Sequence, residues 1–101
     1  MSTMDAYKTE LASFLKGFGA NVRRLRTAKY PALSQERLSF ATRLHRTEIG
    51  KIEQGDVEPR LTTLVILADT LGVTVDALVE NLEVPIERKP SPQARRWLEG
   101  Q

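Results

Sequence analysis

The chain has 101 residues, no cysteine and a formal net charge of +2. This length predicts a single domain, and the lack of cysteine excludes disulfides, thiol catalysis and thiolate metal sites, as fits a reducing compartment. No apolar run approaches the roughly 18 residues that a membrane span needs, and the N-terminal segment lacks the basic start and apolar stretch of a signal peptide. We therefore expect a cytoplasmic protein without a membrane partner.

The charge is unevenly distributed along the chain. Residues 20–60 hold nine Lys or Arg and five Asp or Glu, whereas residues 61–87 hold five acidic residues and no basic one. Residues 88–101 hold four basic residues and one acidic one. A basic segment is what a phosphate-facing surface requires, so residues 20–60 are predicted to carry that surface and residues 61–87 to face away from it.

A long helix is predicted at the N-terminus, from residue 5 to about residue 29. Gly17 and Gly19 weaken its middle, so the pattern leaves open both a continuous helix and a break. The apolar stripe indicates a core or dimer contact. It consists of Tyr7, Leu11, Phe14, Leu15, Phe18, Val22 and Leu25. Residues 28–33 are predicted to form a loop, because Pro31 disfavours helical geometry at Tyr30.

The segment from Ser34 to Gly55 predicts two short helices joined by a tight turn. Ser34 can cap the first helix, with Leu33 and Leu38 packing across its start. The pattern breaks at residues 42–44, and Gly55 ends the second helix. Apolar side chains of the second helix fall on one side, and a polar face remains on the other. That polar face carries Arg46, Thr47, Gly50, Lys51 and Gln54.

The polar face of the second helix has two interpretations. It is either an ordinary solvated surface or a surface suited to close approach of a nucleic-acid groove. In the second case Arg46 can form a fork of hydrogen bonds to guanine, and Thr47 can touch a thymine methyl group.

Further helices are predicted downstream. One runs from Leu61 to Leu71 and ends at Gly72, and Thr74 caps the next, which continues to about Leu82. Ile66 and Val79 lie where this pattern expects solvent. They are either single exposed apolar residues, which are common, or part of a self-association patch.

The composition changes again after Glu83. An extended linker is predicted, and Ser91 and Pro92 then open a short tail helix. Adjacent Trp97 and Leu98 would be unfavourably exposed on so short a helix. We expect this helix to dock on the acidic residues 61–87 of its own subunit or of a partner, and to contribute to dimerisation. The attracting charges are Arg88, Lys89, Arg95 and Arg96.

The whole pattern resembles the lambda-repressor-like (Cro-like, Xre) helix-turn-helix family over roughly residues 18 to 82. The resemblance lies in residues 34–36, Leu38, residues 44–47, Ile49, Ile52, Glu53 and Gly55, and continues through Pro59, Leu64, Ala68, residues 71–73, Asp76 and Leu78. It implies an all-α, five-helix bundle containing a helix-turn-helix. Residues 1–17 would then be an N-terminal helical extension, and residues 83–101 a linker and a short C-terminal tail helix.

The function that the resemblance implies is sequence-specific binding of double-stranded DNA. We expect a bacterial or phage transcription regulator, a repressor, that binds a pseudo-palindromic operator as a homodimer, because one module reads too few base pairs. It would lie in the cytoplasm, at the nucleoid when bound. Base contacts are expected from Arg46, Thr47, Gly50 and Lys51, and phosphate contacts from Gln35, Arg43, His45 and Arg60. The resemblance also implies a structural pair of Arg26 and Glu53, with Arg26 near a phosphate.

Two positions depart from the family pattern. Arg43 stands at the turn position that usually holds glycine, where left-handed geometry would cost about 1 kcal/mol. Either that strain is accepted for a phosphate contact or the turn differs. Phe40 replaces a residue that is usually polar, and it either packs against the N-terminal extension or marks an interface.

Two other classes of function compete with DNA binding. One is a protein-interaction module that keeps the fold, or an antitoxin that grips a protein partner with its tail while repressing its own operon. The other is an enzyme, which finds no support. His45 is the only histidine, and one histidine with scattered carboxylates supplies neither a catalytic set nor a metal site. No glycine-rich nucleotide loop occurs, so no cofactor is expected.

Overall fold

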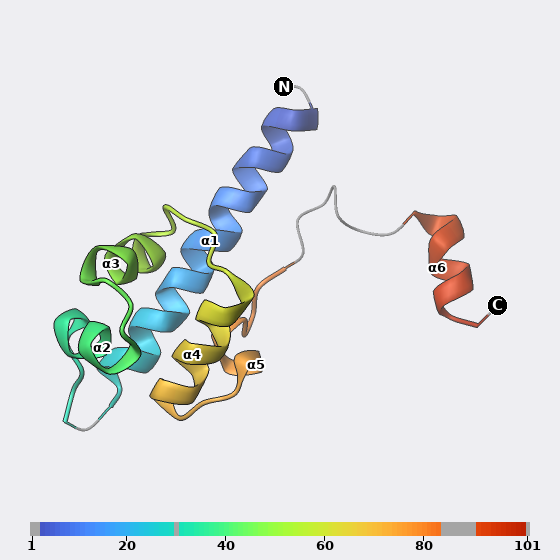
Figure 1. Ribbon diagram of the computed structural model, residues 1–101. Helices are drawn as coiled ribbons and strands as arrows, with labels where there is room; N and C mark the ends of the chain where they lie inside the picture. The colour runs from blue at the N-terminus through green and yellow to red at the C-terminus, as the bar shows by residue number, and fades with distance from the viewer. Residues whose placement is uncertain (1–2, 30, 84–90, 101) are drawn as a thin grey trace.

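The computed structural model describes residues 3–29, 31–83 and 91–100, with side chains from Lys8 onward. Within these ranges the chain is all-α, as predicted (Figure 1). The helices are α1 (Thr3–Thr27), α2 (Gln35–Thr42), α3 (Arg46–Gln54), α4 (Leu61–Leu71), α5 (Val75–Leu78) and α6 (Pro92–Leu98). None of the helices described is long and apolar enough to cross a membrane. The expectations for the Tyr7 side chain, Tyr30 and residues 84–90, including Arg88 and Lys89, lie outside the described residues.

Helix α1 is continuous through the two glycines that made a break conceivable. A Cβ atom on Gly19 would collide with the carbonyl oxygens of Ile52 and Glu53 at the end of α3. A Cβ atom on Gly17 would lie 2.6 Å from Cδ2 of Leu82. The glycines therefore let the α1 backbone lie directly against α3 and the segment after α5, and this packing offsets their low helix propensity. The predicted extension and the first helix of the bundle are one helix.

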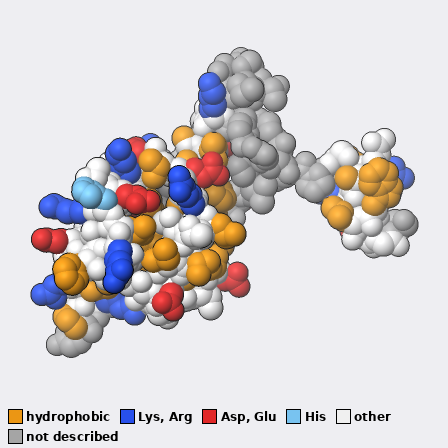
Figure 2. Space-filling model, in the orientation of Figure 1, with side chains coloured by type: hydrophobic (Ala, Val, Ile, Leu, Met, Phe, Trp, Pro, Cys, Tyr) orange, Lys and Arg blue, Asp and Glu red, His pale blue; other side chains and the backbone are white. Residues whose placement is uncertain are grey.

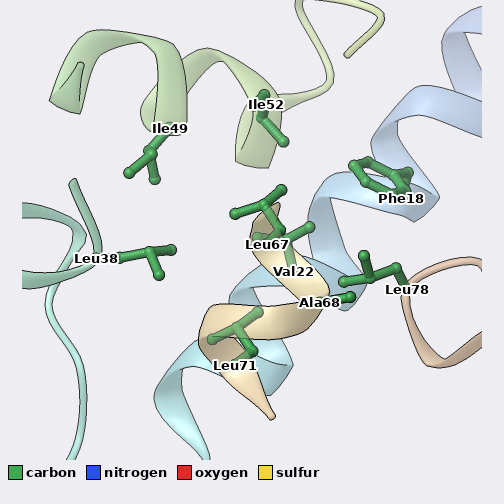
Figure 3. Packing of buried hydrophobic residues seen from close by; sticks show 9 residues of the cluster. All are labelled: Phe18, Val22, Leu38, Ile49, Ile52, Leu67, Ala68, Leu71 and Leu78. Carbon is green, nitrogen blue, oxygen red and sulfur yellow. The ribbon is translucent and has the colours of Figure 1, made fainter. Parts of the chain in front are cut away.

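The hydrophobic core is built by the five helices α1, α2, α3, α4 and α5 (Figure 3). Each of these helices contributes at least one side chain that is buried. The core consists of Phe18, Val22, Leu38, Ile49, Ile52, Leu67, Ala68, Leu71 and Leu78. Because α3 places only Ile49 and Ile52 in the core, the opposite side of this helix is left for other contacts.

Local geometry confirms the predicted starts of α2, α5 and α6 and the predicted ends of α3 and α4. The helix after Thr74 was expected to continue to about Leu82, but α5 ends at Leu78. Ser34 Oγ accepts from the amide of Arg37 at 3.0 Å, and Thr74 Oγ1 accepts from that of Ala77 at 3.2 Å. Ser91 Oγ accepts from the amide of Ala94 in the tail helix. Gly55 and Gly72 end α3 and α4 with φ of 78° and 70°, geometry that side chains disfavour. Each terminus is thus set by residues within about one turn of it.

The turn between α2 and α3 is left-handed at Arg43, with φ of 61° and ψ of 13°. Of the two alternatives for Arg43, the strained geometry is therefore present. The turn is held by hydroxyl groups: Thr42 Oγ1 donates to the Leu38 carbonyl and accepts from the Leu44 amide. Ser39 Oγ also donates to the Leu44 carbonyl at 2.6 Å. These bonds fix the angle between α2 and α3 despite the unfavourable residue at the turn.

Replacing Arg43 with glycine is expected to raise the free energy of unfolding by roughly 0.5–1 kcal/mol, because glycine adopts left-handed geometry without strain. Urea denaturation measures the change. The matched control is Arg37→Gly within α2, which should lower the free energy of unfolding by about 1 kcal/mol. A loss of stability in Arg43→Gly would show that the side chain makes a stabilising contact that outweighs the strain.

Two expectations about exposed apolar residues are corrected. The Phe40 side chain is 91% exposed, so the prediction that it packs against the N-terminal extension is wrong. An interface at Phe40 stays a prediction. Docking of the tail on its own chain is also absent, since α6 has no buried residue and Trp97 and Leu98 are 77% and 75% exposed. Docking on a second subunit stays a prediction.

Candidate nucleic-acid interface

The exposed side of α3 forms the floor of an open depression of about 600 Å³. All four residues predicted to contact bases line it, together with Gln35 and His45 from the predicted phosphate set. The lining is Gln35, His45, Arg46, Thr47, Gly50, Lys51, Gln54 and Asp56. Gln54 was not among the predicted site residues, although its spacing from Thr47 and Gly50 places it on the same helix face. Asp56 lies beyond the helix and left no comparable signal in the sequence.

His45 is the N-cap of α3, consistent with its expected place at the helix entry. Its Nδ1 accepts a hydrogen bond from the Thr47 amide at 3.1 Å. A ring nitrogen that accepts carries no proton, so in the neutral ring the proton lies on Nε2. His45 therefore caps the helix with one nitrogen and keeps a donor for a phosphate or base acceptor with the other.

Gln35 begins α2 beside the same depression. Its Nε2 donates to Glu53 Oε1 at 3.1 Å, which ties the start of α2 to α3. The first amides of a helix have no acceptor within that helix, and the dipole favours an anion there. The position therefore suits the predicted phosphate contact.

Beneath α3 lies the predicted pair of Arg26 and Glu53, which the structure confirms. Arg26 Nε donates to Glu53 Oε2 at 2.7 Å, and Arg26 Nη2 donates to Glu53 Oε1 at 2.9 Å. Arg26 Nη1 donates to the Leu33 carbonyl at 2.8 Å. The hydrogen bond to Glu53, aided by the charge of that carboxylate and opposed by burial, raises the pKa of Arg26. One carboxylate thus connects α1, α2 and α3.

The enclosure of Arg26 bears on its two predicted roles. The residue is only 8% exposed, and all three guanidinium nitrogens donate to groups of the protein itself. Arg26 is therefore the structural partner of Glu53, while its contact with a phosphate stays a prediction.

Exposed basic side chains surround α3. Arg43, Arg46, Lys51 and Arg60 are all exposed. Arg60 lies in a second hollow of about 310 Å³, where Glu48 and Glu58 balance the charges of Arg60 and Lys51. Arg43 lines neither hollow. Figure 2 shows basic side chains around α2 and α3, with acidic ones between them. No cluster of three or more potential metal ligands occurs in the part of the chain that the structure describes.

Gly50 has no packing reason to be glycine. An added Cβ atom would meet only Gln35 Oε1, at 3.8 Å, which is ordinary contact. The residue lies inside a helix, where glycine costs about 1 kcal/mol relative to alanine. The fold therefore does not explain why residue 50 is glycine. The free space on its outer side favours close approach of a ligand as the reason.

Replacing Gly50 with alanine is expected to raise the free energy of unfolding by about 0.5–1 kcal/mol. The same change should weaken DNA binding by roughly 1–3 kcal/mol, the usual effect of an extra methyl group in a close contact. Thermal unfolding and a binding titration measure the two effects. Gly19→Ala is the matched control and should lower stability, because its methyl group would collide with the α3 carbonyls. Unchanged DNA affinity in Gly50→Ala would contradict close approach at this position.

Comparison with known proteins agrees with this arrangement of helices. A helix-turn-helix family model matches residues 32–78. The control protein C.BamHI of Bacillus amyloliquefaciens is 38% identical over 63 residues, which cover 62% of this chain and 76% of that protein. The crystal structure of the restriction-modification controller protein C.AhdI from Aeromonas hydrophila superposes with a TM-score of 0.59 at 37% identity. The superposition covers 66% of this chain and 97% of the C.AhdI chain. The chain belongs to the lambda-repressor-like (Xre) helix-turn-helix family.

Another control protein is matched over a smaller part of its own length. The control protein C.SmaI of Serratia marcescens is 45% identical over 47 residues, which cover 46% of this chain and 56% of that protein. In this family context α2 and α3 are the two helices of the motif, and α3 is the second.

Proposed function

We propose that this chain is a sequence-specific regulator of transcription that places α3 in the major groove of double-stranded DNA. The observation that carries the proposal is the depression on α3. It brings Arg46, Thr47, Gly50 and Lys51 together on one open surface, with Gln35 and His45 at its edge. A recognition helix needs such a surface: donors for base edges, space for close approach, and groups at the rim for phosphates.

The residues take distinct roles in this proposal. Arg46 donates a fork of hydrogen bonds to guanine, Thr47 and Lys51 contact neighbouring base edges, and Gly50 admits the groove wall. The exposed side chains Arg43 and Arg60, with Gln35 and His45, hold phosphates. Residues 18–82 form the DNA-binding domain, with residues 1–17 as its helical extension and residues 83–101 as linker and tail.

The regulator acts as a homodimer on a pseudo-palindromic operator. A single α3 spans too few base pairs for useful specificity, and a two-fold dimer doubles the site. The relatives are named as control proteins or, in Bacillus subtilis, as a prophage-derived helix-turn-helix transcriptional regulator. Control is the role these names share, and the Bacillus subtilis name specifies transcription. A dimer bound over a promoter would exclude polymerase, so we propose repression, at the bacterial nucleoid.

Selection of bound sequences from a random pool of double-stranded DNA tests this function. The expected outcome is a palindrome, whereas no enrichment would favour the alternative in which the fold serves mainly to bind a protein partner.

The salt dependence of binding to the selected site gives a second, quantitative test. A dimer that neutralises phosphates with Arg43 and Arg60 in each half is expected to show a log–log slope of about −4, at −0.9 per phosphate. Arg43→Ala should reduce the slope to about −2, because it removes one contact from each half. A wild-type slope near zero would contradict the proposed phosphate contacts.

A further inference from the structure

The outer surface of α4 and α5 exposes more apolar area than a solvated helix pair requires. We call this surface the α4–α5 face. Its apolar members are Leu61, Val65, Ile66, Val75 and Val79, with exposed fractions of 73%, 53%, 37%, 36% and 36%. Figure 2 shows hydrophobic side chains gathered over α4, with acidic side chains at the edge of the group. A group of exposed apolar side chains of this kind marks an interaction surface.

The acidic residues beside this face are available for pairing. Asp69 and Asp76 are exposed, and neither forms an ion pair within the described residues. By contrast, Glu80 is engaged with Arg24 at 3.4 Å. An occupant of the face should therefore be apolar in its centre and basic at its border.

Helix α6 of this same sequence has that composition. Ala94, Trp97 and Leu98 are spaced i, i+3 and i+4, so they share one side of the helix. Arg95 and Arg96 stand beside them in the last turn. A helix of seven residues is not stable by itself in water, so α6 needs a surface to pack on.

Within one chain the two complementary surfaces do not meet, since Trp97 and Leu98 remain largely exposed. The chain between Leu82 and Pro92 has nine residues, which reach at most about 30 Å when extended. That length is sufficient to cross to a neighbouring molecule.

We propose that α6 of one copy docks on the α4–α5 face of a second copy. Trp97 and Leu98 cover Val65 and its apolar neighbours, while Arg95 and Arg96 pair with Asp69 and Asp76. Two-fold symmetry makes the exchange reciprocal, so each dimer contains two such contacts. This inference rests on the homodimer of the proposed function, but it does not require DNA.

Trp97 is the only tryptophan, so its fluorescence reports docking directly. Two full-length variants separate exchange between copies from docking within one copy. Val65→Lys damages the face and keeps the tryptophan. The double variant Trp97→Ala, Leu98→Ala damages the tail, keeps the face and has no tryptophan. Every fluorescence change in their mixture therefore reports the tail of the Val65→Lys copy.

The wild-type protein should show blue-shifted emission that iodide quenches weakly, and Val65→Lys alone should show red-shifted, readily quenched emission. Adding excess tail-damaged variant to Val65→Lys should restore the blue shift, because the tail can then reach an intact face on the other copy. Ala12→Lys adds the same charge to the exposed side of α1 and should leave Trp97 protected. Leu61→Lys provides a second damaged face, and circular dichroism checks that both face variants keep the helical fold.

Three outcomes would overturn the proposal. Red-shifted wild-type emission would show that α6 does not dock, and wild-type emission retained by both face variants would place the tail elsewhere. Loss of the blue shift in the face variants without recovery on mixing would show docking within one copy. Failure of DNA selection with successful recovery on mixing would remove the proposed function and leave the tail exchange in place.

Discussion

Replacing Glu53 with alanine is expected to lower the free energy of unfolding by about 3–5 kcal/mol, the cost of removing one partner from a buried ion pair. The two side chains are only 10% and 4% exposed, so the Arg26 charge would be left with little solvent. Gln35 would lose its acceptor at the same time. Urea denaturation followed by circular dichroism measures the loss.

A surface ion pair of the same chain is the matched control. Arg24 and Glu80 lie 3.4 Å apart, with side chains 54% and 55% exposed, and Glu80→Ala should cost at most about 1 kcal/mol. Because the pKa of Arg26 is raised in the fold, its contribution is fully present below the unfolded-state pKa and is lost only when the pH rises through the folded-state pKa. The difference between the two variants should therefore be constant around neutral pH. Equal losses in both variants would show that the buried pair adds no more than a solvated one.

Replacing Arg46 with alanine is expected to weaken binding to the selected operator by about 1–3 kcal/mol, while binding to random DNA changes little. The reason is that a guanidinium directed at guanine contributes only where the correct base is present. Titrations of both DNA molecules at one salt concentration measure the difference.

Arg60→Ala is the control for Arg46, since it also removes an exposed arginine but from a proposed phosphate contact. It should weaken operator and random DNA by similar factors. If Arg46→Ala lowers both affinities equally, Arg46 contacts the backbone and base reading must be reassigned to Thr47 and Lys51.

Most helix ends were predictable because their causes are local, whereas the end of α5 at Leu78 was not. Ser34, Thr74 and Ser91 each cap a helix through an amide three residues away, and Gly55 and Gly72 end helices through their own backbone geometry. The side of α3 that faces outward was also predictable, because the spacing of Ile49 and Ile52 fixes its buried side.

Features that depend on contacts between several helices could not be predicted from a local sequence pattern. The pairing of Arg26 with Glu53 followed from the family resemblance, but the depth at which the pair is buried did not. Continuity of α1 could not be decided from propensity, because Gly19 is explained by carbonyl groups of α3 that are distant in sequence. The tail was expected to cover an apolar surface, yet the sequence does not distinguish its own surface from that of a second copy.

The carboxylate of Glu53 fixes the orientation of α3, and this affects which mutations the protein can accept. Apolar contacts alone would let α3 roll about its axis, whereas the two-pronged bond from Arg26 and the bond from Gln35 fix its rotation. Arg26 and Glu53 lie on the inner side of α3. Gln35 lies at the edge of the depression, and Arg46, Thr47, Gly50 and Lys51 lie on the outer side. Mutations can therefore change the outer side one position at a time while the orientation of α3 stays the same. Under the proposed function, the operator sequence can therefore change during evolution while the fold stays stable.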